Sequence, residues 1–133
     1  MVKLNKIAPT PAADSASDDI LLDIKDLSVE FWTELGVKQA INHLNLTIRK
    51  GEALGLVGEA GAGKTSTALA ILRLLQPKVS KVVSGSIYYK GVDMATYSEK
   101  QMQNLRGNNI SMIFQNPLTS LNPVFTVGEQ LAL

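Results

Sequence analysis

The sequence predicts an α/β fold in which an antiparallel β part precedes a partial parallel sheet with helices. Residues 20–48 contain two runs where apolar and polar side chains alternate, as in half-buried strands joined by a short turn. Residues 53–58 (ALGLVG) form a nearly all-apolar run ending in glycine, which is typical of a strand buried on both faces. A glycine-rich loop and an amphipathic segment follow, so this strand is expected to lead into a helix that packs back on the sheet.

The composition is that of an ordinary globular chain of 133 residues, enough for one domain with a sizeable core. Hydrophobic residues make up 45%, and 13 basic against 12 acidic side chains give a net charge of +1. This balance argues against a broad charged surface for nucleic acid or anionic lipid, so no nucleic-acid partner is expected. Cysteine is absent, which excludes disulfides and thiolate metal sites. The first 19 residues contain no apolar run that could serve as a signal-peptide core, so no signal peptide is expected. No apolar run reaches about 18 residues, so no transmembrane segment is expected.

The N-terminal residues 1–19 are predicted to be a flexible tail. Their second half, residues 8–19 (APTPAADSASDD), is rich in Ala, Pro, Ser and Asp and offers little apolar surface to bury. A strand is expected over residues 20–32 and a turn at residues 33–36 (TELG). The strand that follows is expected to face the core with Leu44, Leu46 and Ile48.

Further elements are predicted after the glycine-rich loop. A helix is expected whose apolar side chains recur at 3.6-residue spacing and which Pro77 limits, the apolar positions being Ala68, Ile71, Leu72 and Leu75. Residues 85–91 (GSIYYKG) are predicted to form a strand, and residues 98–106 a short helix with Ser98 as its N-cap, closed by Gly107. A second buried strand (ISMIF, residues 110–114), a proline-containing loop and a final helix (VGEQLAL, residues 127–133) complete the expected order.

The loop VGEAGAGKTST, residues 57–67, fits the phosphate-binding pattern G-x-x-x-x-G-K-[ST]. Its glycines accept backbone angles that a Cβ disfavours, and its N–H groups can form an anion-binding nest extended by the positive end of the next helix. Lys64 would reach the β- and γ-phosphates, and the Thr65 hydroxyl would ligate Mg²⁺. The pattern alone leaves an ATPase, a GTPase and a small-molecule kinase open. The candidate nucleotide-binding residues are Gly58, Glu59, Ala60, Gly61, Ala62, Gly63, Lys64, Thr65 and Ser66.

Two longer stretches narrow this choice: LSVEF with AINHLNLTIRKGEALGLVGEAGAGKTST, and LRGNNISMIFQNPLTSLNPVFTVGEQL. They resemble the nucleotide-binding subunits of ATP-binding cassette (ABC) transporters, and the second is most similar to the branch serving dipeptide, oligopeptide and nickel importers. The resemblance covers roughly residues 20–133. It implies the N-terminal portion of a P-loop NTPase cassette, ending just after the family's Q-loop, with ATP and Mg²⁺ as cofactors.

The resemblance also implies roles for residues outside the phosphate loop. Gln115, which lies 51 positions after Lys64 (115 minus 64), matches the Q-loop glutamine and is expected to reach Mg²⁺ or the attacking water. The loop after it, residues 116–124, is expected to meet the membrane subunit. Phe31 falls near the family's adenine-stacking aromatic. Trp32 is a close rival, and packing in the core is an equal alternative for either ring.

The sequence departs from the family pattern at a few positions. Ala60 and Ala62 stand where serine is common, so side-chain hydroxyl contacts are lost while backbone donors remain, and weakened nucleotide binding is expected. Asn116 stands where an acidic residue is common in this branch. His43, the single histidine, precedes the phosphate loop and does not match the switch histidine, so a structural or surface role is expected.

The 133 residues contain no match to the family's signature (LSGGQ), to its apolar strand ending in Asp-Glu, or to its switch histidine. The expectation is therefore a truncated piece with an incomplete sheet. The leading hypothesis is an importer ATPase subunit for peptides or similar solutes, peripheral on the cytoplasmic face of the membrane. Its partners would be the permease subunits, a second ATPase subunit and, indirectly, an extracytoplasmic solute-binding protein. The alternative is a non-catalytic nucleotide-binding or permease-docking fragment. A small-molecule kinase is disfavoured because no arginine-rich lid is visible.

Overall fold

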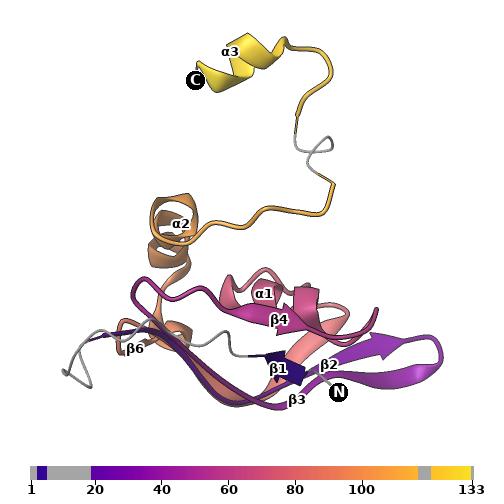
Figure 1. The fold of residues 1–133 in the computed structure, drawn as a ribbon. Helices are drawn as coiled ribbons and strands as arrows, with labels where there is room; N and C mark the ends of the chain where they lie inside the picture. The colour runs from indigo at the N-terminus through magenta and orange to yellow at the C-terminus, as the bar shows by residue number, and fades with distance from the viewer. Residues whose placement is uncertain (1–2, 6–18, 117–120, 133) are drawn as a thin grey trace.

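A four-stranded antiparallel sheet is the centre of the computed structural model, which describes residues 3–5, 19–116 and 121–132 (Figure 1). Its strand order is β3-β2-β5-β6. The two longest strands form a hairpin whose turn lies at the predicted TELG sequence. The strands are β2 (Ile20–Thr33), β3 (Gly36–Arg49), β5 (Ser80–Tyr89) and β6 (Val92–Asp93).

The core lies on one face of this sheet. Ile24, Leu27 and Val29 of β2 are almost completely buried, and the neighbouring strands add further apolar side chains. On β3, Leu44 and Leu46 are buried and Ile48 is partly buried against them. The predicted hairpin and its alternating apolar face are therefore confirmed.

Three neighbouring strands bend at the same level. Asp26 of β2, His43 of β3 and Gly85 of β5 have positive φ angles of 52°, 47° and 89°. The pairing of β2 with both neighbours shifts register around Asp26, as expected for β-bulges, which bend a strand and increase its twist. The His43 ring and the Asp26 carboxylate meet at this bend, with 2.6 Å between Nδ1 and Oδ1, and both side chains are exposed.

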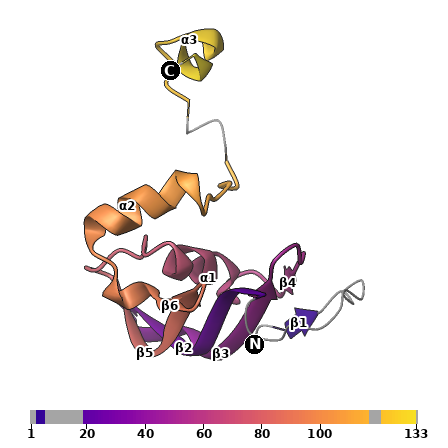
Figure 2. The same cartoon turned by 90° about the vertical axis from the view of Figure 1, so that its left-hand side faces the viewer.

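Helices cover the core face of the sheet (Figures 1 and 2). Helix α1 spans Lys64–Ile71, the short 3₁₀ helix η1 spans Met94–Thr96, and α2 spans Glu99–Asn108. Helix α1 buries Thr67 and Ala70, and partly buried Ile71 packs against the same core. The predicted helix after the loop is present, although it ends well before Pro77.

Helix α2 agrees with its prediction at both ends. The Ser98 hydroxyl accepts the N–H of Gln101, and the Gln101 side chain accepts the N–H of Ser98, which makes a capping box. The backbone leaves helical angles at Arg106 and Gly107, where Gly107 has φ 86°. Met102 and Leu105 are buried between these ends.

Two arginines connect the helical segments. The Arg106 guanidinium donates to the carbonyl oxygens of Leu72 and Arg73 at the end of α1, and also pairs with Glu99. The Arg73 guanidinium donates to the carbonyl oxygens of Met94 and Tyr97. These charge-assisted bonds fix the end of α1 against η1 and α2.

The expected parallel sheet is the part of the fold prediction that the structure contradicts. From ALGLVG only β4 (Gly55–Val57) forms, and it pairs antiparallel with β1 (Lys3–Asn5), inside the range predicted as a tail. Val57 is 58% exposed, so β4 is not buried on both faces. Residues 110–114 form no strand beyond a single bridge between Arg106 and Ile110. A parallel strand needs neighbours and cover on both faces, and the described residues supply neither.

The last described helix, α3 (Val127–Leu131), confirms the prediction of a helix near the end of the sequence. It buries none of its residues and stands apart from the sheet in both views (Figures 1 and 2). Within the described ranges no helix is long and apolar enough to cross a bilayer.

Candidate functional site

The glycine-rich loop connects β4 directly to α1, as the sequence predicts. Gly61 and Gly63 have φ angles of 79° and 88°, a region that side chains other than glycine rarely adopt. Gly63 is the residue preceding α1, and no side chain caps the helix there. The N–H groups of the first helical turn have no partner within a helix, so they remain available to an anion.

Gly63 also seats the loop on the sheet. A Cβ at Gly63 would overlap the carbonyl oxygen of Ala40 and approach the Ile41 side chain. Ala40 is the unpaired residue where the β2–β3 register shifts, because Val29 pairs with Ile41 and Glu30 with Gln39. The bulge in β3 and the glycine in the loop therefore fit each other, and both are needed for this approach.

The Lys64 ammonium folds back over the loop. Its Nζ donates to the carbonyl oxygens of Gly58 and Glu59 at 2.6 and 2.7 Å. A turn between Glu59 and Ala62 closes the same loop, with 3.1 Å from the Ala62 nitrogen to the Glu59 oxygen. A cation held at the mouth of a glycine-rich loop places positive charge where a phosphate chain would enter.

The hydroxyl residues after Lys64 divide into an exposed group and a buried one. Thr65 is exposed and Ser66 is partly buried. Thr67 is 3% exposed, and its hydroxyl donates to the Gly63 carbonyl at 2.9 Å. In the described part of the chain no hydrogen bond occupies the Thr65 hydroxyl, and no carboxylate contacts Lys64 or Thr65.

The loop therefore fits a nucleotide with its metal. The unpaired donors at the start of α1 and the Lys64 ammonium suit the phosphates, and the free Thr65 hydroxyl suits a hard cation such as Mg²⁺. Ala60 and Ala62 add only backbone groups to this set, as the sequence implies.

The two candidate aromatic residues lie on opposite faces of the hairpin. Phe31 is partly buried, packs against the core and pairs with Lys38 across the ladder. Trp32 pairs with Val37 on the other face and is 44% exposed. Because successive side chains of a strand alternate between faces, only Phe31 shares a face with the core and with Lys38.

Lys38 is a neighbour of the loop that the sequence analysis did not single out. A methyl group built at Gly61 would lie 3.9 Å from the Lys38 Nζ, so this ammonium sits beside the loop. Its register follows from the tight hairpin turn, which pairs Thr33 with Gly36 and Phe31 with Lys38. Counting outward from the TELG turn would have found this pair.

Gln115 lies in an irregular, exposed stretch after α2, and Asn116 beside it is also exposed. Among the described residues, no hydrogen bond links Gln115 to the phosphate loop. Residues 117–120 of the loop expected to meet a membrane subunit lie outside the described residues.

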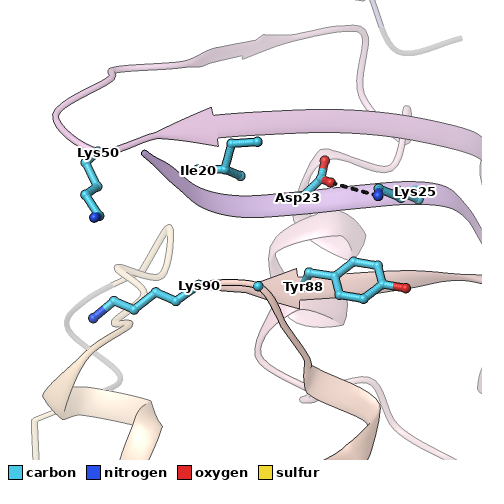
Figure 3. A pocket seen from close by; sticks show the side chains of 7 residues that line it. Ile20, Asp23, Lys25, Lys50, Tyr88 and Lys90 are labelled. Carbon is cyan, nitrogen blue, oxygen red and sulfur yellow. Dashed lines mark ion pairs between the residues drawn. The ribbon is translucent and has the colours of Figure 1, made fainter. Parts of the chain in front are cut away.

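A pocket of about 600 Å³ lies near the start of β2 and the end of β3 (Figure 3). Lys25, Lys50 and Lys90 line it together with Asp23 and Tyr88. The Lys25 ammonium pairs with Asp23 at 3.4 Å and lies over the Tyr88 ring. None of the phosphate-loop residues lines this pocket, so it is separate from the candidate nucleotide site.

A strand that passes through a glycine-rich loop into a helix beginning with lysine defines the class of P-loop nucleotide-binding proteins. The chain belongs to the ABC transporter family, whose model matches residues 41–132. The fold of the described residues is accordingly a mixed α/β piece of the family's ATPase domain.

Several curated relatives are ATP-binding proteins of peptide transporters. The chain is 50% identical over 114 residues to "Probable peptide ABC transporter ATP-binding protein y4tR" of Sinorhizobium fredii, covering 86% of this chain and 34% of that protein. It is 47% identical to the oligopeptide transport ATP-binding protein OppD of Bacillus subtilis, covering 84% and 31%. The OppD of Salmonella typhimurium is 45% identical, with 93% and 35% covered. The chain thus spans about a third of the length of these relatives, and the resemblance to peptide-importer ATPases is confirmed.

Proposed function

We propose that the chain is part of the ATP-binding subunit of an ABC importer that energises uptake of peptides or similar solutes. The observation that carries the proposal is the loop between β4 and α1, with Gly63 seated on the β3 bulge and Lys64 over the loop mouth. The relatives named for peptide transport support the solute class.

In this proposal residues 58–66 hold the phosphates of ATP. The backbone donors before and within the first turn of α1 contact the β-phosphate, and Lys64 leaves the loop carbonyls to meet the β- and γ-phosphates. Thr65 would ligate Mg²⁺, which would offset the charge of the phosphates, and Gln115 would reach the metal or the attacking water. Phe31 is the proposed adenine-stacking residue rather than Trp32, because Phe31 faces the loop side of the sheet.

The proposed setting is the cytoplasmic face of the membrane, with the subunit bound peripherally. The loop after Gln115 would dock on the permease subunits, and a second ATPase subunit would complete the nucleotide site. An extracytoplasmic solute-binding protein would act with them indirectly. These partners fit the transport relatives and remain part of the proposal.

Calorimetric titration with Mg-ATP tests the nucleotide site. The parent chain is expected to bind Mg-ATP, and Lys64→Ala is expected to weaken binding at least about tenfold, since it removes a charged phosphate contact. Lys100→Ala, an exposed lysine at the start of α2, is the matched control and should bind as the parent does. Equal affinity of Lys64→Ala and the parent would show that the assigned site is wrong.

A second candidate function is nucleotide binding or permease docking without turnover. It is favoured by one observation: within the described residues no carboxylate contacts Lys64 or Thr65, where a water-polarising group would be needed. A steady ATPase rate of the purified chain that Lys64→Ala abolishes would rule this candidate out. Binding without turnover would support it.

A further inference from the structure

The hairpin of β2 and β3 places a second ammonium beside the phosphate loop. Lys38 is the third residue of β3, and its Nζ approaches Gly61, where a methyl group would lie 3.9 Å away. Gly61 is the middle glycine of the loop, and Lys64 bonds the loop carbonyls of Gly58 and Glu59. Two cations from separate elements thus lie at one glycine-rich loop.

Nothing in the described ranges neutralises the Lys38 charge. No hydrogen bond or ion pair of residues 3–5, 19–116 and 121–132 involves its ammonium, and the side chain is exposed. Lys64, by comparison, is held by two loop carbonyls. An exposed, unpaired ammonium next to a phosphate-binding loop attracts an anion bound in that loop.

The face on which Lys38 lies is set by the ladder. Lys38 pairs with Phe31, so both side chains project on the face that carries the core and α1. A nucleotide whose phosphates enter the loop and whose base reaches Phe31 would pass Lys38 on the way. The position is fixed by the sheet, because the β3 bulge at Ala40 is also the seat of Gly63.

We infer that Lys38 is a second cationic contact for the phosphate chain of the nucleotide, supplied by the β2–β3 hairpin rather than by the loop. This inference rests on the proposed nucleotide site at residues 58–66. It deepens that proposal, because the charge of Lys38 would make the affinity rise more steeply from adenosine to ATP as phosphates are added. Lys38 would contact the phosphates through its charge, while Lys64 remains the principal contact.

The test is a titration of the full 133-residue chain with Mg-ATP, ADP, AMP and adenosine at low and high salt. Lys38→Met, which keeps the length of the side chain and removes its charge, is expected to weaken Mg-ATP binding about two- to fivefold at low salt, as for an exposed charge pair. The loss should shrink from ATP to AMP, vanish for adenosine and diminish at high salt, because screening weakens exposed pairs. Lys38→Arg should restore most of the affinity.

Two controls separate this inference from the proposed function. Lys90→Met removes a lysine that lies over the Tyr89 ring near the separate pocket, and it should leave all four affinities unchanged. If Lys38→Met binds ATP within twofold of the parent while Lys64→Ala loses binding, the inference on Lys38 is overturned and the nucleotide site stands. If the parent does not bind ATP, or Lys64→Ala binds it equally, both fail. An equal loss of affinity for ATP and adenosine would also overturn the inference, because a structural defect weakens binding regardless of the number of phosphates.

Discussion

The sheet of residues 20–93 and the segment of residues 110–132 differ in how far they bury their apolar side chains. In the sheet, Leu27 and Val29 are completely buried. In the later segment, Ile113 is 91% exposed, and Val124, Phe125 and Leu131 are all more than half exposed. Both regions have comparable apolar content, so the difference comes from the partners available to each.

The contrast follows from the type of pairing. Antiparallel strands joined by a short turn find their partner next to them in the sequence, as β2 and β3 do. Strand β5 then completes the core by pairing antiparallel with β2, although β3, β4 and α1 lie between them in the sequence. Strands of a parallel sheet need crossover connections and helices on both faces. The phosphate loop can therefore pack against a stable hairpin, while the apolar run at 110–114 has no described strand beside it.

The largest expected effect is the loss of a core side chain. Leu27→Ala should lower the free energy of unfolding by about 2–5 kcal/mol, because it removes a fully buried side chain and leaves a cavity. Urea unfolding followed by circular dichroism measures it. Ile113→Ala is the matched change in the exposed segment and should shift the unfolding free energy by less than about 0.5 kcal/mol. Equal losses of unfolding free energy in the two variants would contradict the difference in burial between the two regions.

The second largest effect is expected at the contact between Gly63 of the loop and strand β3. Gly63→Ala should destabilise the chain by about 1–3 kcal/mol and weaken Mg-ATP binding, because the new methyl group meets the Ala40 carbonyl and the residue has φ 88°. Gly61→Ala shares the left-handed backbone, but its methyl group would meet only the Lys38 Nζ at an ordinary contact distance of 3.9 Å, so only the backbone strain of about 1 kcal/mol is expected there. Thermal unfolding and ATP titration of both variants compare them. An equal result would show that Gly63 does not contact β3.

The two capping boxes give a smaller and sharper comparison. Ser98→Ala removes the cap of α2, which buries Met102 and Leu105, and should cost about 1 kcal/mol of global stability. Thr126→Ala removes an equivalent cap from α3, which buries nothing, and should leave the global unfolding midpoint in urea unchanged. A global shift from Thr126→Ala would show that α3 packs on the rest of the molecule.

The smallest effect is the titration of the α3 cap. The Thr126 hydroxyl and the Thr126 N–H bond the Glu129 carboxylate and lower the pKa of that carboxyl below its ordinary value. Since the pKa is lower in the folded helix, the cap stabilises α3 above the unfolded pKa and loses this contribution as the pH falls through the lowered value. NMR titration of the Glu129 side-chain carbon should show the low pKa, and Thr126→Val should raise it toward the ordinary value. An unchanged pKa in Thr126→Val would contradict this cause.

The sequence predicted most local features of the fold because neighbouring residues determine them. The alternation in β2 and β3, the TELG turn and the Ser98 cap all act within a few positions of one another. The parallel sheet was predicted wrongly because an apolar run such as ISMIF shows that a segment avoids water, and it does not show which strand will cover it. Lys3–Asn5 pairs with β4 although nothing in its composition indicates a strand.

In the candidate site, too, some residues could be predicted from the sequence and others could not. The loop residues could be predicted from the sequence, since each lies a fixed number of positions from Lys64. The pairing of Lys38 with Phe31 can be counted from the turn, but its approach to Gly61 cannot, because that depends on how the loop lies over the hairpin. The contact of Ala40 with Gly63 depends in addition on a bulge that shifts the register of the hairpin. A single unpaired residue at Ala40 determines which face and which carbonyl meet the loop.

Residue-resolved NMR of the backbone amides during addition of Mg-ATP tests the central claim most directly. The account predicts that the signals of residues 58–66 and of the β3 seat at residues 38–41 shift together and saturate with one affinity. The signals around Lys25 and Lys90 at the separate pocket should stay unchanged. Saturating shifts at that pocket with none at residues 58–66 would contradict the assignment of the nucleotide site to the loop that rests on β3.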